Sequence, residues 1–133
     1  MKYMLDTNIC IYIIKKKPLK VFQALQSLKV GDICISSITY AELQYGVHKS
    51  QYQERNKMAL AKFLVPITIL PFSDKAASLY GNIRAKLEKE GQIIGAYDLL
   101  IGSHALSEKL VLVTNNTNEF NRIPNLQIEN WVK

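Results

Sequence analysis

The chain has 133 residues, of which 48% are hydrophobic, and its 17 Lys and Arg against 11 Asp and Glu give a net charge of +6. These values are typical of one globular domain over residues 1–133 and exclude a disordered chain. No apolar run approaches the roughly 20 residues that a bilayer span needs. Asp6 and Asn8 interrupt the apolar N-terminal stretch, which argues against a signal peptide. Cys10 and Cys34 lie within apolar runs, so we expect buried, reduced thiols in a cytoplasmic protein.

Short apolar runs alternate with amphipathic stretches along the chain. The runs predicted to be strands are residues 2–5, 32–35, 66–70, 110–113 and, as a candidate fifth, 126–128. A first helix is expected between Asp6 and Lys15, and the other predicted helices are residues 21–28, 37–47 (with Ser37 as its N-cap), 54–64, 73–90 and 97–108. Strands that alternate with helices form βαβ units, and strands without polar alternation are buried on both faces. The sequence therefore predicts an α/β fold around a parallel sheet of four to five strands.

Four acidic residues follow the predicted strands. Asp6 comes directly after the first strand, Glu42 lies early in the helix after the second, Asp98 begins the last long helix, and Glu119 follows the fourth strand. In an open parallel sheet, sites form beyond the carboxyl ends of the strands. The other seven acids face 17 basic residues, so the rest of the chain carries +10. A small acidic pit in a basic surface is typical of a metal-dependent enzyme that acts on nucleic acid.

Electrostatics explains why such a cluster needs a cation. Two carboxylates about 4–5 Å apart repel each other by roughly 3–4 kcal/mol at an effective dielectric constant near 20. Gathered carboxylates therefore raise one another's pKa or move apart, unless a cation neutralises them. Mg²⁺ prefers carboxylate and water oxygens, and it can stabilise the charge that develops on a phosphodiester.

Each acid also has a purely structural interpretation. Asp6 fits the N-cap of the next helix, with Asn8 as a helper, and Asp98 fits the favourable N-terminal end of a helix dipole. Glu119 fits a solvated loop. Glu42 lies in a mostly apolar stretch, where an acid needs a partner. The common placement of the four at strand ends favours a site over these alternatives.

The other charged residues give weaker signals. His104 lies six residues past Asp98 and is expected to have a packing role. The basic run Lys15, Lys16 and Lys17 fits either a solvated loop or a phosphate contact. Arg84 fits either a phosphate contact or an ion pair with Glu88, four residues further along the helix.

Several short motifs, taken in this order, resemble the PIN-domain ribonucleases and, more closely, the VapC toxins of type II VapBC toxin–antitoxin systems. The resemblance spans essentially the whole chain. The motifs are residues 5–8 (Leu-Asp-Thr-Asn), 36–43 with Gly46, 94–101 with His104, 113–116 with Glu119 and Phe120, 122–124 and 129–131.

This resemblance implies a three-layer α/β/α PIN-like domain with a divalent-metal site. Asp6, Glu42 and Asp98 would bind Mg²⁺ or Mn²⁺, and Glu119 would take a fourth acidic position. The residues implied to hold these carboxylates are Thr7, Asn8, Ser37, Thr114 and Asn116. The implied reaction is hydrolysis of an RNA phosphodiester by water, which leaves a 5′-phosphate and a 3′-hydroxyl.

The resemblance also implies partners. The expected substrate is tRNA, with initiator tRNA as one candidate, and the basic residues named above are candidate contacts. A VapB-type antitoxin would cover a groove beside the active site, and the toxin would form a homodimer and a larger complex with the antitoxin. Candidate apolar surfaces for these contacts include Ile11, Ile13, Ile14, Val47 and the region of Phe63.

Three other protein classes compete with a nuclease. A receiver domain needs adjacent acids after its first strand, whereas Asp6 stands alone. A phosphatase with an aspartyl nucleophile needs Asp where this chain has Asn8. A non-catalytic RNA-binding module needs the basic surface but not the four acids. The sequence therefore favours the nuclease.

Overall fold

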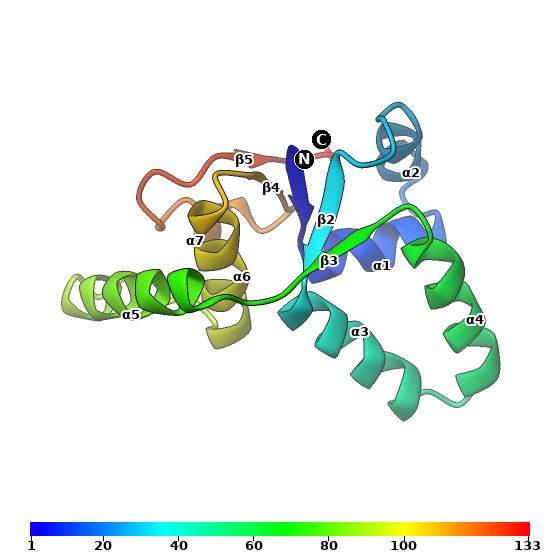
Figure 1. The fold of residues 1–133 in the computed structure, drawn as a ribbon, viewed down its shortest axis with the longest axis horizontal. Coiled ribbons are helices and arrows are strands. Elements are labelled where there is room, and N and C mark those ends of the chain that lie inside the picture. The colour runs from blue at the N-terminus through cyan, green and yellow to red at the C-terminus, as the bar shows by residue number, and fades with distance from the viewer.

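The computed structural model describes residues 1–133 and contains one five-stranded sheet with helices on both faces (Figure 1). No helix in it has the length and apolar character of a membrane span. In chain order the elements are β1 (Tyr3–Leu5), α1 (Thr7–Lys15), α2 (Leu19–Gln26), β2 (Ile33–Ser36), α3 (Ser37–Lys49), α4 (Gln53–Leu64), β3 (Thr68–Leu70), α5 (Asp74–Lys89), α6 (Ala96–Ser107), β4 (Val111–Val113), α7 (Thr117–Phe120) and β5 (Ile128–Glu129).

All four strand pairings are parallel, in the order β3-β2-β1-β4-β5. The chain builds outward from β1 to β2 and β3, and then returns to place β4 and β5 on the other side of β1. The strand order therefore reverses between β1 and β4, and ligands bind at such a switch point in open α/β sheets. Leu5 pairs with Val113, so the next residues, Asp6 and Thr114, come side by side at the carboxyl edge.

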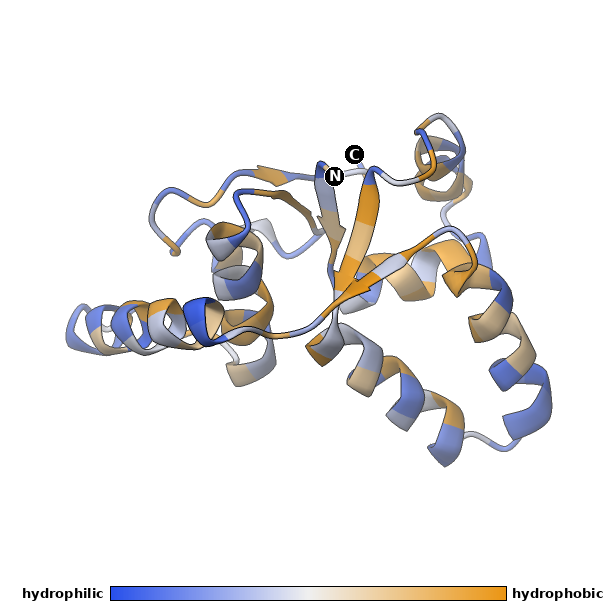
Figure 2. Ribbon diagram, viewed as in Figure 1, coloured by the Kyte–Doolittle hydropathy of each residue, from blue (hydrophilic) through white to orange (hydrophobic).

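The two faces of the sheet have separate hydrophobic cores, which confirms the predicted three-layer fold. Successive residues of β1 point to opposite faces of the sheet, so they belong to different cores. Tyr3 and Leu5 pack with α1, α2, α3 and α4, whereas Met4 packs with α5, α6 and α7. Figure 2 shows hydrophobic strands inside a shell of helices with mixed faces. Burial on both faces explains why the strand sequences show no polar alternation.

Local details correct three expectations. The N-cap of α3 is Ser36, whose Oγ accepts a hydrogen bond from the backbone N–H of Ile38 at 3.1 Å, so the predicted cap at Ser37 is wrong by one residue. The short helix α7 lies in a region predicted to be a loop. Strand β3 begins at Thr68, two residues later than predicted.

Candidate active site

Asp6 is the most buried of the four acids, with 3% of its surface exposed. Its Oδ1 caps α1 by accepting from the N–H of Ile9 at 2.9 Å, and its Oδ2 accepts from the hydroxyl of Thr114 at 2.5 Å. Asp6 is therefore the helix cap that the structural interpretation anticipated, and it also belongs to the acidic cluster. Burial and the charge of Glu42 raise the pKa of Asp6 against the lowering effect of these two hydrogen bonds.

Asp98 lies in the first turn of α6 and is half-buried. Burial, together with the charges of Asp6 and Glu119, raises its pKa to about 6. Asn116 donates to its Oδ2 at 3.2 Å, which partly offsets this rise. The carboxylates of Asp6 and Glu119 are therefore close enough to destabilise the charge of Asp98.

Glu42 joins the group from the first turns of α3. The hydroxyl of Thr7 donates to its Oε1 at 2.6 Å and lies 3.3 Å from the hydroxyl of the buried Thr39. Because Thr7 directly follows Asp6, this bond ties Glu42 to the end of β1. Glu42 acts electrostatically on Asp6, and Asp6 and Glu119 act on Asp98, so the four predicted acids are neighbours in a row at the switch point.

Polar side chains connect the acids into one network. Thr114 donates to Asp6 and accepts from the backbone N–H of Asn116 at 2.9 Å, and the Asn116 side chain donates to Asp98. Three of the five polar residues expected to hold the carboxylates, Thr7, Thr114 and Asn116, therefore donate to them.

The other two of those residues lie differently. Asn8 is exposed and hydrogen-bonds to none of the four acids. The Ser37 hydroxyl accepts from the backbone N–H of Phe72 at 3.0 Å, so it holds the chain after β3 rather than a carboxylate. The adjacent Ser36 hydroxyl instead meets Nδ1 of the buried His104 at 2.8 Å. His104 has the structural position that its spacing predicted.

None of the four acids is paired with a basic side chain. The one ion pair of the structure joins Nε of Arg84 to Oε2 of Glu88 at 3.0 Å on α5. Lys15, Lys16 and Lys17 lie at the opposite end of α1 from Asp6, roughly 14 Å along the helix axis, so they do not neutralise that carboxylate. The acidic cluster is therefore electrostatically uncompensated by the protein itself.

The donor set fits a hard divalent cation. No three His, Cys, Asp or Glu side chains lie close enough together to hold a metal ion between them. Mg²⁺ does not need three such side chains, because it keeps several waters and is commonly held by one or two carboxylates. Asp6 and Asp98 provide such a pair, and each Asp6 oxygen carries only one protein hydrogen bond.

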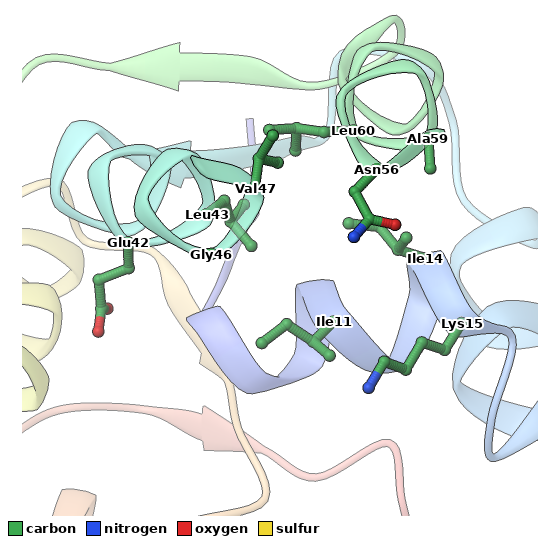
Figure 3. A pocket seen from close by; sticks show the side chains of 10 residues that line it. All are labelled: Ile11, Ile14, Lys15, Glu42, Leu43, Gly46, Val47, Asn56, Ala59 and Leu60. Atoms are coloured by element: carbon green, nitrogen blue, oxygen red, sulfur yellow. The ribbon is translucent and has the colours of Figure 1, made fainter. Parts of the chain in front are cut away.

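Two hollows flank Glu42 on α3. One of about 310 Å³ lies between α1, α3 and α4, and most of its lining is aliphatic (Figure 3). Ile11, Ile14 and the largely buried Val47 line it, whereas Ile13 and Phe63 belong to the core and are not part of its lining. The other hollow has a volume of about 700 Å³, and Thr7 and Asn8 are part of its lining. Its lining also includes two exposed tyrosines, Tyr45 and Tyr97, which were not predicted as site residues from the sequence.

Comparison with known proteins agrees with this architecture. The family model "PIN domain" matches residues 3–126. The chain is 54% identical over 134 residues to "Ribonuclease VapC2" of Rickettsia felis, covering 100% of both chains. It is 46% identical over 131 residues to "tRNA(fMet)-specific endonuclease VapC" of Shigella flexneri, covering 98% of both.

The solved structures include a VapBC2 complex of Rickettsia felis bound to a DNA fragment from its promoter. That structure has a TM-score of 0.92 and 52% identity, and the match covers 98% of this chain and 99% of the other. Sequence and structure therefore agree over nearly the whole length. The chain belongs to the PIN-domain family, and within it to the VapC ribonucleases.

Proposed function

We propose that this protein is the toxin of a toxin–antitoxin pair, an Mg²⁺- or Mn²⁺-dependent endoribonuclease that cleaves tRNA in the cytoplasm. The observation that carries the proposal is the uncompensated acidic cluster at the switch point, in which burial and the charges of Asp6 and Glu119 raise the pKa of Asp98. The relatives named tRNA(fMet)-specific endonuclease support tRNA as the substrate class, with initiator tRNA as the first candidate.

Asp6 and Asp98 are proposed as the principal metal ligands, with Glu42 and Glu119 acting directly or through water. When bound, the metal would neutralise charge on the phosphate and lower the pKa of the attacking water. Thr114 and Asn116 fix the oxygens of Asp6 and Asp98 through hydrogen bonds, and Thr7 fixes Glu42. Such support keeps the acidic oxygens oriented while substrate binds. We expect products with a 5′-phosphate and a 3′-hydroxyl.

The apolar hollow of Figure 3 is the proposed site of a VapB-type antitoxin. It lies between α1, α3 and α4, and Glu42 is part of its lining. A peptide seated on Ile11 and Ile14 would therefore reach the acidic cluster and obstruct it. Solved VapBC complexes of related proteins support VapB as the class of partner, and we propose that the toxin dimerises within the larger complex.

The test is cleavage of purified tRNA by the isolated protein and by Asp98→Asn. We expect Mg²⁺-dependent cleavage by the parent, none in EDTA, and none by Asp98→Asn. Asp74→Asn is the matched control, because Asp74 is an exposed acid in the first turn of α5, and it should cleave like the parent. Cleavage by Asp98→Asn at the parental rate would refute the site assignment, and a parent that binds tRNA without cleaving it would leave only a binding protein.

A further inference from the structure

The larger hollow beside the acidic cluster adjoins the apolar hollow of Figure 3 along α1 and α3, and it has groups that the apolar hollow lacks. It measures about 700 Å³ and lies between α1, α3 and the start of α6. Tyr45, Lys49 and Tyr97 line it. Asn8 and Glu42 also line it, at the end that adjoins the acidic cluster. The hollow of Figure 3 offers mainly Ile, Leu, Val and Ala side chains instead. The larger hollow therefore adds aromatic, cationic and polar groups to a lining that is otherwise aliphatic.

The two tyrosines are both exposed and both next to proposed metal ligands. Tyr45 is 66% exposed and Tyr97 is 60% exposed. Tyr45 lies three residues after Glu42 on the same face of α3, and Tyr97 directly precedes Asp98 at the start of α6. Neither ring contributes to the core, so packing does not explain the position of either one.

Lys49 supplies an uncompensated positive charge at the far end of the same helix face. Its Nζ lies 5.0 Å from the centre of the Tyr45 ring, and it forms no ion pair. It is seven residues beyond Glu42, roughly 10 Å along the helix axis. The hollow thus runs from an acidic end, which suits a metal-bound phosphate, past two aromatic rings to a cation, which suits a second phosphate.

From these features we infer that the Tyr45–Tyr97 hollow is a nucleotide subsite that holds an unpaired base of the RNA substrate next to the cleaved phosphodiester, with Lys49 on a neighbouring phosphate. Aromatic side chains stack on single-stranded bases whatever their sequence, whereas bases inside a duplex are already stacked. The enzyme would therefore select unpaired RNA. This inference rests on the proposed nuclease function.

The test measures RNA affinity in the Asp98→Asn background, so that binding is separated from cleavage. The probes are a fluorescent RNA hairpin with a single-stranded loop and a blunt RNA duplex of the same length. We expect the hairpin to bind more tightly than the duplex. Tyr45→Ala and Tyr97→Ala should each weaken hairpin binding by about 5- to 100-fold, and Tyr45→Phe, which keeps the ring, should stay within about twofold of the parent.

Tyr52→Ala is the matched control. Tyr52 is 59% exposed and has Arg55 4.4 Å from its ring centre, but it lies at the start of α4 outside the hollow. It should bind the hairpin like the parent. Lys49→Ala should lower the salt dependence of binding by about one phosphate contact. Thermal melting of each variant checks that a lost affinity is not a lost fold.

Three results would overturn the inference. The tyrosine variants could bind the hairpin as tightly as the Asp98→Asn protein, they could lose the same affinity for hairpin and duplex, or the Asp98→Asn protein could show no measurable hairpin binding. A change of oligomeric state without a change in RNA affinity would assign the hollow to a protein contact instead. If Tyr45→Ala and Tyr97→Ala with intact acids cleave tRNA normally while Asp98→Asn is inactive, the subsite fails and the nuclease stands. If the parent cleaves no RNA, the proposed function itself fails.

Discussion

Replacing Asp98 with Asn should stabilise the metal-free protein while removing its activity. The rise of the Asp98 pKa from its ordinary value of 3.8 to about 6 corresponds to a free-energy penalty of about 3 kcal/mol for ionising it in the folded state. Solvent screens a half-buried carboxylate, so we expect a gain of 1–2 kcal/mol, or roughly 3–8 °C in melting temperature. The amide keeps an oxygen for the hydrogen bond from Asn116.

The sign of the pH dependence follows from the two pKa values. Between about pH 4 and pH 6 the folded protein holds a proton on Asp98 that the unfolded chain has already lost, so the stability contributed by Asp98 falls as pH rises through this window. The advantage of Asp98→Asn should therefore be near zero at pH 4 and complete above pH 7.

The assay is urea unfolding of both proteins in EDTA across this pH range. Asp74→Asn, which removes an exposed charge from an equivalent helix turn, should show no such pH-dependent gain. If Asp98→Asn is no more stable than the parent at pH 8, neither burial nor the neighbouring acids penalise the charge of Asp98 in the folded protein, and the argument for an uncompensated cluster is wrong.

Three further predictions use other parts of the structure. Mg²⁺ at ten times its dissociation constant should stabilise the parent by about 1.4 kcal/mol and Asp98→Asn by much less; equal shifts by thermal melting would place the ion elsewhere. Thr114→Val removes the buried donor to Asp6, so it should lower the free energy of unfolding by about 1.5–3 kcal/mol and slow cleavage; unchanged urea unfolding and cleavage would contradict this. Gly81→Ala adds a Cβ with no neighbour within 4 Å and should stabilise α5 by about 0.5–1 kcal/mol. The Cβ of Gly102→Ala would lie 2.5 Å from Cδ1 of the buried Ile123 and should destabilise by about 1–3 kcal/mol; the same sign for both glycines in urea unfolding would refute the packing argument.

Most of the fold could be predicted because the hydrophobic pattern of each segment agrees with the element that the segment forms. Apolar runs predicted the first four strands, and helix periodicity predicted the long helices. The candidate fifth strand, residues 126–128, overlaps β5 only at Ile128. The short helix α7 escaped prediction, since four residues are barely one turn and show no periodicity. The one-residue error at the start of α3 arose because Ser36 and Ser37 are both good caps, and only the contacts with His104 and Phe72 distinguish them.

The candidate site was predictable as far as it depends on strand ends. A parallel sheet brings residues that follow its strands to one edge, which is why Asp6, Glu42, Asp98 and Glu119 could be grouped. The direction of a side chain is set by tertiary contacts instead. The exposed Tyr45 and Tyr97 read as ordinary apolar residues of helices, and only the structure shows that both line one hollow beside the acids.

The most direct test of the central claim is the position of a bound metal ion. Crystals of the protein soaked in Mn²⁺ would locate the ion by its anomalous scattering. We predict a peak about 2 Å from carboxylate oxygens of both Asp6 and Asp98, lost in Asp98→Asn crystals. Mn²⁺ bound only at other acidic residues, with that position empty at saturating concentration, would contradict the account.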